Sequence, residues 1–339
     1  MLSVKDGLVS PDLLLVRALN NAMLWPPWLV MVYGLCSKKN LCSLCNRSAH
    51  NMREKRVKKE DFQEGIALLA EPVLPLVSIV QFLYLTGPFD RVEEVIDEMP
   101  EPIETGYALY ENPRELLRSH LEHLCLLEGL KNDEEIGLHV VNESGEPVDD
   151  MTARASLLSQ RIMEDELEAI NSVLCGPCGC TLCCTGPDTT MNQEFFEIPL
   201  KAEEKALFPV VRHDSADSRR RLALDDEILQ IDGAPFYQLP DPGLFRWQNG
   251  WSLILPRESY CPGLEENGRC RVYTNRPQVC RRPQVFSYIL EKTDQPDQYR
   301  LRSSLLAVTD CPFVQVLQEE IAAYAAACEM ELVLKGNKQ

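Results

Sequence analysis

Positive charge is scarce in this chain of 339 residues, in which 34 Lys and Arg stand against 52 Asp and Glu. The formal charge is −18, and the basic residues are unevenly placed, because residues 1–60 hold ten of them and only four acids. The rest of the chain is therefore strongly acidic, whereas phosphate binding needs a cationic surface. We expect no nucleic-acid partner, and we expect the acidic surface to serve solubility.

The chain also lacks the common motifs of nucleotide and metalloprotease chemistry. It contains no G-x-G-x-x-G after a predicted strand, no P-loop and no H-E-x-x-H. The C-x3-C-x2-C signature of radical enzymes is absent as well. No catalytic base or nucleophile stands out from the pattern, so the sequence leaves open whether the chain is an enzyme.

Long uninterrupted apolar runs are missing too. Residues 22–36 are apolar but hold two prolines and are shorter than the roughly 18–20 residues that a spanning helix needs. Residues 66–86 are long enough but contain Glu71, Pro72 and Pro75. We expect buried helices broken by prolines. The alternative is an interfacial or spanning helix, with the basic N-terminal segment on anionic lipid.

Patterning divides the chain into three parts and predicts an α+β fold. Residues 1–60 form a basic N-terminal segment. Residues 61–150 form a mainly helical region that ends in a polar, acidic linker from residue 131. Residues 151–335 form a cysteine-rich metal-binding domain of short strands, loops and helices. The apolar residues thus supply a helical core before the cysteines begin.

Apolar stripes predict helices within these parts. One stripe runs directly into Cys175 and comprises Leu158, Ile162, Leu167, Ile170 and Leu174. Asn112, Pro113 and Glu115 predict the start of another helix that carries Cys125 on its apolar side. A third helix opens at Pro312 and places Cys328 on its apolar face. We therefore expect Cys125 and Cys328 to be core cysteines.

Cysteine is the abundant reactive residue, with fourteen in the chain. No secretory signal with a clear cleavage site is present, so we expect a cytoplasmic protein with reduced thiols. Clustered thiols in such a compartment are usually metal ligands or redox groups. Nine cysteines form two groups: Cys175, Cys178, Cys180, Cys183 and Cys184, and then Cys261, Cys270, Cys280 and Cys311.

The first group combines C-x2-C units with residues that allow tight turns. A C-x2-C spacing lets two thiolates point at one ion, and Gly176, Pro177 and Gly179 favour the necessary turns. Five cysteines within ten residues exceed the needs of one tetrahedral zinc ion. The pattern indicates more than one metal, or a cluster completed from elsewhere.

The second group supplies candidate ligands from separate loops, because its spacings of nine, ten and thirty-one residues are too wide for a knuckle. Soft thiolates select zinc, copper(I) or iron–sulfur centres over magnesium or calcium. The interspersed arginines would offset thiolate charge or recognise an acidic ligand. Ordinary surface pairing is the alternative for these residues, which are Arg271, Arg276, Arg281 and Arg282.

The cysteine pattern resembles the YkgJ-like cysteine-cluster family, which is described as zinc- or iron-chelating. A double cysteine follows a C-x2-C, and a later run reads C-x8-C-x-x-Y-x-x-R-P-x-x-C-R. This run comprises Cys261, Cys270, Tyr273, Arg276, Pro277, Cys280 and Arg281. The resemblance covers about residues 170–315 and implies bound zinc or iron, with a [4Fe–4S] cluster among the choices. Pro177 stands where the family has a ligand, so Cys180, Cys183 and Cys184 are favoured over Cys175 and Cys178.

Three functions follow from this pattern. The first is a metal-binding protein without catalysis, in storage, delivery or a structural role. The second is an iron–sulfur enzyme related to flagellin lysine N-methylase, a group with a similar cysteine cluster that uses S-adenosylmethionine. The third is a thiol-based redox sensor. A metal ion is the expected partner, and no protein partner is indicated.

A further cysteine set near the N-terminus has knuckle-like spacing around a central C-x2-C. Four such ligands can close a structural zinc site. Free thiols are the alternative. The set comprises Cys36, Cys42, Cys45 and His50.

Overall fold

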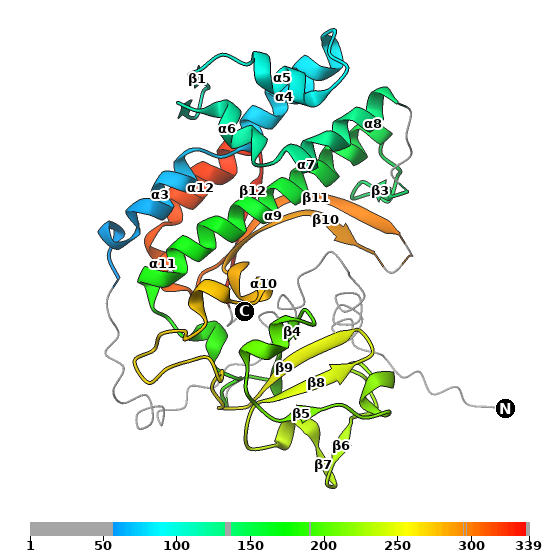
Figure 1. The fold of residues 1–339 in the computed structure, drawn as a ribbon, viewed down its shortest axis with the longest axis vertical. Coiled ribbons are helices and arrows are strands. Elements are labelled where there is room, and N and C mark those ends of the chain that lie inside the picture. Colours follow the sequence, from blue (N-terminus) through cyan, green and yellow to red (C-terminus); the bar gives the residue numbers. More distant parts are fainter. Residues whose placement is uncertain (1–56, 133–136, 190, 294, 296, 337–339) are drawn as a thin grey trace, which may run out of the picture.

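The computed structural model describes residues 57–132, 137–189, 191–293, 295 and 297–336. The second metal site predicted from Cys36, Cys42, Cys45 and His50 lies outside the described residues, as does nearly all of the basic N-terminal segment. The described part contains both helices and strands, so the predicted α+β class is confirmed. Figure 1 shows a helical upper part and a smaller lower part built mainly of strands.

Helix α9 (Asp150–Cys178) runs through the middle of the upper part (Figure 1). The carboxylate of Asp149 caps its N-terminus by accepting the N–H of Thr152 at 2.9 Å. The helix ends where Gly179 adopts a left-handed conformation, with φ of +59°. The apolar stripe predicted to precede Cys175 is confirmed, because all five of its side chains are buried.

A four-stranded sheet packs against α9. It contains β3 (His139–Val141), β10 (Val285–Lys292), β11 (Gln298–Val308) and β12 (Glu331–Lys335). β10 is antiparallel to β11, whereas β3 and β12 run parallel to β11 along different parts of its length. The register of the β10–β11 ladder shifts between Tyr288 and Leu290, and there Gln160 of α9 accepts the N–H of Ile289 at 3.0 Å. This contact joins the helix to the sheet.

The remaining helices complete the same core. They are α3 (Gln63–Ala70), α4 (Leu74–Thr86), α5 (Val92–Glu98), α6 (Pro113–Arg118), α7 (Leu121–Leu124), α8 (Glu128–Lys131), α11 (Pro312–Val316) and α12 (Gln318–Ala327). Buried side chains from residues before and after position 150 belong to one hydrophobic cluster. The stretch predicted as a polar linker also includes β3, whose Val140 and Val141 are buried.

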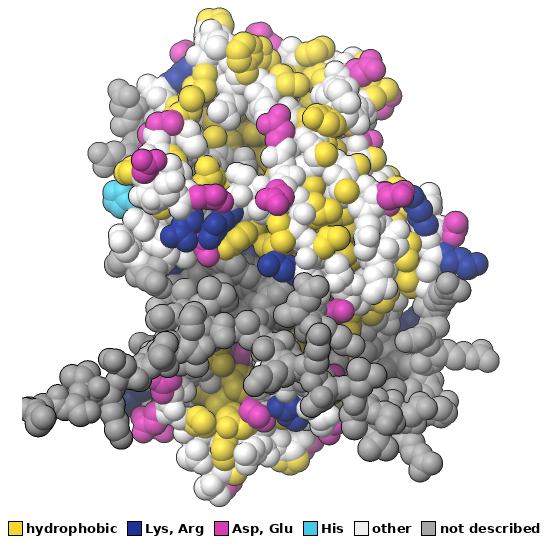
Figure 2. Space-filling model, turned by 180° about the vertical axis from the view of Figure 1, so that it is seen from behind, with side chains coloured by type: hydrophobic (Ala, Val, Ile, Leu, Met, Phe, Trp, Pro, Cys, Tyr) yellow, Lys and Arg dark blue, Asp and Glu magenta, His cyan; other side chains and the backbone are white. Residues whose placement is uncertain are grey.

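The break between α3 and α4 falls at Glu71–Val73, which includes Pro72, whereas Pro75 lies in the first turn of α4. By length and composition alone, the stretch Lys59–Thr86 is apolar enough to cross a membrane, a property that it shares with core helices of soluble proteins. Leu76 and Val80 of this stretch are fully buried in the main core. In Figure 2, acidic and basic side chains are interspersed with apolar ones over the back of the upper part.

The prediction that Cys125 is a core cysteine is wrong. Cys125 is exposed, whereas Cys328 is buried as expected. The helix predicted to begin at Pro113 does so, but it ends at Arg118 and is followed by separate short helical turns. Each break changes the direction of the following side chains, so the 3.6-residue stripe does not carry through to Cys125.

The lower part is a second four-stranded sheet with its own small cores. Its order is β4 (Phe195–Leu200), β9 (Gly250–Pro256), β8 (Gly243–Trp247) and β5 (Arg212–His213). Strand β9 contains the apolar run Trp251–Leu255. Side chains alternate between the two faces, so Leu253 and Leu255 enter one cluster and Ile254 enters the other. Two short hairpins complete the strands: β1 (Ile103–Glu104) with β2 (Leu109–Tyr110), and β6 (Gln230–Ile231) with β7 (Ala234–Pro235).

Candidate metal centre

The nine predicted cysteines are all described, and none forms a disulfide. They lie on the last turn of α9, the loop that follows it, the 3-10 turn η3 (Leu182–Cys184), the loop after β9, helix α10 (Gln278–Arg281) and the residue before α11. These segments lie where the two parts of the fold meet (Figure 1). The two cysteine groups touch directly, because the N–H of Cys261 donates to the carbonyl of Cys184 at 2.7 Å.

A glycine allows this contact. Thr185 and Tyr260 form an isolated antiparallel bridge, and the N–H of Gly186 donates to the carbonyl of Ser259 at 2.8 Å. A Cβ atom at Gly186 would lie 2.0 Å from the carbonyl oxygen of Pro256, closer than real atoms approach. The first cysteine loop therefore lies against the end of β9 only because residue 186 has no side chain.

Three sulfur atoms form the tightest group. The Sγ atoms of Cys178, Cys180 and Cys311 all lie within 4.8 Å of one another, and Cys178 and Cys311 are buried. Tetrahedral zinc holds thiolates at about 2.3 Å, which places the sulfurs about 3.8 Å apart. These three cysteines are close enough to bind a metal ion. We call them the three-cysteine group; no other set of three ligands in the described residues meets the same distance.

The local fold brings the three thiols together. Gly179 turns the chain back after α9, so Cys180 returns toward Cys178. Cys311 occupies the cap position before α11. The thiols of Cys180 and Cys311 donate hydrogen bonds to Cys178 and lower its pKa, with further help from the N–H of Phe313. The same contacts raise the pKa of Cys311.

The other six cysteines lie on the last turn of α9, on η3, in the loop after β9 and on α10. We call them the six-cysteine group, which comprises Cys175, Cys183, Cys184, Cys261, Cys270 and Cys280. Cys183 lies near both Cys175 and Cys280, because its charge raises the pKa of each of these thiols. Burial raises the pKa of Cys261 to about 11 and raises that of Cys280 as well. Cys183 also acts on Cys180, so the two groups adjoin.

Arg276 brings a buried positive charge to these thiols. Its side chain is only 6% exposed and stacks on the ring of Tyr273, with 3.8 Å from Cζ to the ring centroid. Burial raises the pKa of Cys175 to about 11, and a hydrogen bond from Arg276 acts in the opposite direction. None of the described ion pairs joins Arg276 to a carboxylate. A buried cation needs a counter-charge, and the adjacent sulfurs provide it once they are thiolates.

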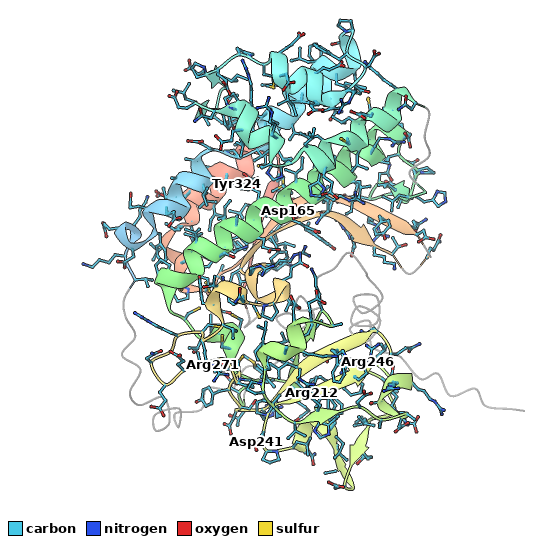
Figure 3. All side chains as sticks on the ribbon, in the orientation of Figure 1. Asp165, Arg212, Asp241, Arg246, Arg271 and Tyr324 are labelled. Atoms are coloured by element: carbon cyan, nitrogen blue, oxygen red, sulfur yellow. The ribbon has the colours of Figure 1, made fainter. Side chains whose placement is uncertain are left out.

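The other predicted arginines have different partners. Arg281 pairs with Glu168 at 2.6 Å, and Arg282 pairs with Glu164 at 3.4 Å and with Glu168 at 3.5 Å. Arg271 donates to the carbonyl of Pro262 at 3.2 Å and lies in the exposed loop between the two parts (Figure 3). The two glutamates fix α10 to α9, a role that the sequence reasoning missed. Their i, i+4 spacing on α9, ahead of the first cysteine, was the available signal.

No protein-family model, curated protein or solved structure matches the chain. The resemblance to the YkgJ-like family therefore stays a prediction from the cysteine spacing. The three-cysteine group is supported independently by the distances between its three sulfur atoms.

Proposed function

We propose that this chain is a metal-binding protein in which Cys178, Cys180 and Cys311 hold a zinc or iron ion. The observation that carries the proposal is the approach of three sulfur atoms to within 4.8 Å in a largely buried site. Three soft donors favour zinc or an iron–sulfur centre over magnesium or calcium. The YkgJ-like cysteine pattern supports the same two metals. Metal binding at this junction would hold α9, η3 and α11 in place.

The six-cysteine group extends this proposal to a second centre. Nine thiols are more than the four that one tetrahedral ion or one cubane cluster takes from a protein. Cys183 adjoins Cys180, so it is placed to complete the first centre or to bridge the two. Arg276 offsets part of the negative charge that several thiolates would bring. The chain would thus carry two adjacent metal centres.

Burial favours a metal site over a redox sensor. A sensor thiol has to meet its oxidant at the surface. Cys311 is 0% exposed and Cys178 is 5% exposed, so neither sulfur is open to solvent. The same burial protects bound metal from water and chelators, as storage or structural roles require.

Anaerobic purification followed by metal analysis tests the proposal. The wild-type chain should contain stoichiometric zinc, or iron with an absorption band near roughly 400 nm that bleaches on reduction. Cys311→Ser should lower the metal content, because it removes one ligand of the three-cysteine group. Cys328→Ser is the matched control, since Cys328 is also buried but contacts Tyr324 on α12. Equal metal content in the two variants, or metal-free wild-type protein, would refute the assignment.

A further inference from the structure

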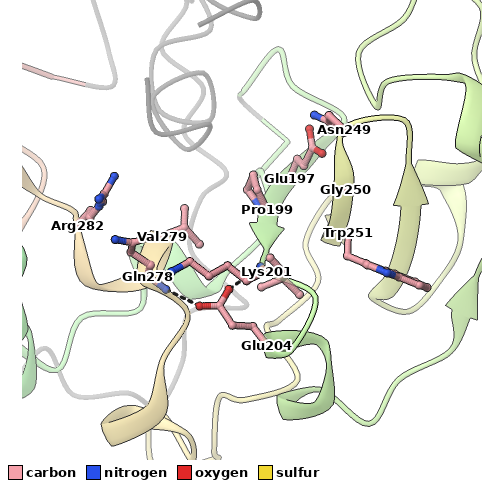
Figure 4. Close-up of a pocket in the computed structure, with 11 residues that line it drawn as sticks. Glu197, Pro199, Lys201, Glu204, Asn249, Gly250, Trp251, Gln278, Val279 and Arg282 are labelled. Atoms are coloured by element: carbon pink, nitrogen blue, oxygen red, sulfur yellow. Dashed lines mark hydrogen bonds between the residues drawn. The ribbon is translucent and has the colours of Figure 1, made fainter. Parts of the chain in front are cut away.

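Helix α10 carries Cys280 into the metal centre and also forms one wall of a cavity of about 250 Å³. Figure 4 shows this cavity between α10 and the lower sheet, whose strand β4 supplies part of the opposite wall. Glu204 joins the two walls, because its oxygens accept the N–H of Lys201 at 2.7 Å and the N–H of Gln278 at 3.0 Å. The cavity lies beside the metal centre, but its described lining includes none of the cysteines.

Most of the charge in the cavity lining is balanced within the protein. Arg282 pairs with Glu164 at 3.4 Å and with Glu168 at 3.5 Å, and both glutamates belong to α9. Glu204 remains a carboxylate and lies beside Lys201 in Figure 4, so these two residues add no net charge. The side of the cavity formed by α10 and the end of β4 is therefore neutral overall.

Glu197 is the charged residue of the lining that no cation balances. The strand reads Phe-Phe-Glu-Ile-Pro-Leu, and alternation places Glu197 on the same face as Phe195 and Pro199. Among the residues that the structure describes, no Lys, Arg or His forms an ion pair with Glu197. Burial raises its pKa to about 7, and the hydroxyl of Ser252 acts in the opposite direction. A buried carboxylate of this kind lacks the counter-charge that would stabilise it.

A short hydrogen-bond chain orients this carboxyl group. The indole N–H of Trp247 donates to the hydroxyl oxygen of Ser252 at 2.8 Å. The only hydrogen of that hydroxyl is then left for Glu197. One carboxyl oxygen is therefore engaged by the sheet, and the other can accept a hydrogen bond from a ligand. Figure 4 shows the Glu197 side chain in the cavity lining, next to Asn249.

The rest of the cavity lining is largely apolar. Pro199 and Leu200 contribute from β4, Trp251 contributes from β9, and Val279 contributes from α10. Apolar surface of this kind gains from covering an alkyl chain. A ligand that is cationic at one end and apolar along its length therefore matches both Glu197 and its surroundings.

We propose that the cavity binds a small alkylammonium ion, whose charged nitrogen meets Glu197 and whose alkyl chain lies along Pro199 and Val279. The ammonium group supplies the counter-charge that the protein itself does not provide. This assignment needs no metal and no catalysed reaction, so its test is independent of the metal content of the chain.

Calorimetric titration of the purified protein with matched probes tests the proposal. The probes are the straight-chain amines from ethylamine to hexylamine and the alcohols of the same lengths. At pH 8, at least one amine should bind roughly tenfold or more tightly than its alcohol, because a hydrogen bond to a charged group contributes that much. Within the amine series, each methylene that the cavity covers should tighten binding about fourfold. Equal affinity for amines and alcohols, or no binding by either series, overturns the proposal.

The pH dependence of binding tests whether Glu197 is the partner. The amines stay protonated from pH 6 to pH 8, whereas Glu197 titrates near the middle of this range. The affinity of the best amine should therefore fall about tenfold from pH 8 to pH 6, because the carboxyl group gains a proton. The affinity of the matching alcohol should stay the same. An amine affinity that does not change between these pH values overturns the assignment.

One variant tests the role of Glu197 directly. Glu197→Gln should lower the affinity of the best amine to that of its alcohol and remove the pH dependence. Glu203→Gln is the matched control, because Glu203 is exposed and lies outside the cavity lining. Circular dichroism identifies a variant that fails to fold, and the wild-type probe series still decides the proposal in that event. A folded Glu197→Gln variant that binds the amine as tightly as wild type overturns it.

Discussion

Replacing Glu166 by Gln should change how the stability of the chain depends on pH. Glu166 lies in the middle of α9, and its two oxygens face different elements. The hydroxyl of Tyr324 on α12 donates to Oε2 at 2.6 Å, and the N–H of Val73 before α4 donates to Oε1 at 3.0 Å. Figure 3 shows Tyr324 on α12 near α9. Burial raises the pKa of Glu166 from 4.5 to about 7 although both hydrogen bonds lower it.

The sign and size of the effect follow from this shift. Between pH 4.5 and about 7, the folded chain keeps a proton on Glu166 that the unfolded chain has already released. The free energy of unfolding therefore falls as pH rises through this window, and the stabilisation is complete only below pH 4.5. A shift of about 2.5 units at about 1.4 kcal/mol per unit gives a loss of about 3 kcal/mol. Glutamine has no such proton, so the variant lacks this loss.

Urea denaturation at several pH values between 4.5 and 8 measures the effect. The difference in unfolding free energy between wild type and Glu166→Gln should change by about 3 kcal/mol across the window, in favour of the variant at high pH. Comparing two chains with identical cysteines cancels the pH dependence of the thiols. Glu64→Gln serves as control, because Glu64 is exposed on α3. Parallel pH curves for wild type and Glu166→Gln would refute the reasoning.

Two further predictions concern the frame of the metal centre. Gly186→Ala should lower the free energy of unfolding by about 1–3 kcal/mol in urea titrations, because its Cβ meets backbone that has to move. Gly106→Ala, with open space around it, should leave stability nearly unchanged, and equal effects would contradict the steric argument. Arg276→Met should lower metal affinity at least about tenfold in chelator competition, because the thiolates lose a buried counter-charge. Arg271→Met should leave metal affinity unchanged, because Arg271 donates to a backbone carbonyl. A similar loss of metal affinity in both variants would indicate a general effect of charge.

The sequence predicted the elements of the centre better than their arrangement. The helix that carries Cys175 was predictable from its apolar stripe. Such a stripe shows which face of a helix is buried, and it can be recognised without the rest of the chain. Wide spacing between Cys261 and Cys280 predicted separate loops, but Cys261 and Cys270 share the loop after β9 and Cys280 lies on α10. The partition into three and six cysteines was not predictable. It depends on how Gly179 turns Cys180 back and on where α11 places Cys311.

Cys178, which the family spacing did not favour, joins Cys180 in the three-cysteine group for a physical reason. Family spacing favoured Cys183 over Cys178, but α9 continues through Pro177 to Cys178 and buries that thiol beside Cys311. Sequence spacing gives only the distance between cysteines along the chain, whereas the end of α9 determines the direction in which the Cys178 side chain points.

The role of Cys183 gives the sharpest test of whether the thiols form two linked centres. Its charge acts on Cys180 in the three-cysteine group and on Cys280 in the six-cysteine group. If the chain holds two centres, Cys311→Ser and Cys280→Ser should each retain about half of the wild-type metal, because each removes a ligand from one centre. The metal content of Cys183→Ser should fall well below half of the wild-type value, because Cys183 adjoins both centres.

Metal analysis of the three variants after anaerobic purification, with Cys328→Ser beside them, distinguishes the possible arrangements. Complete loss of metal in both Cys311→Ser and Cys280→Ser would mean one centre that needs both groups. Unchanged metal in Cys280→Ser would confine the ligands to the three-cysteine group and leave the six partly buried thiols without a metal. Arg276 argues against that outcome, because a buried guanidinium beside neutral thiols would lack a counter-charge among the described residues. The thiolates of a second centre would provide it.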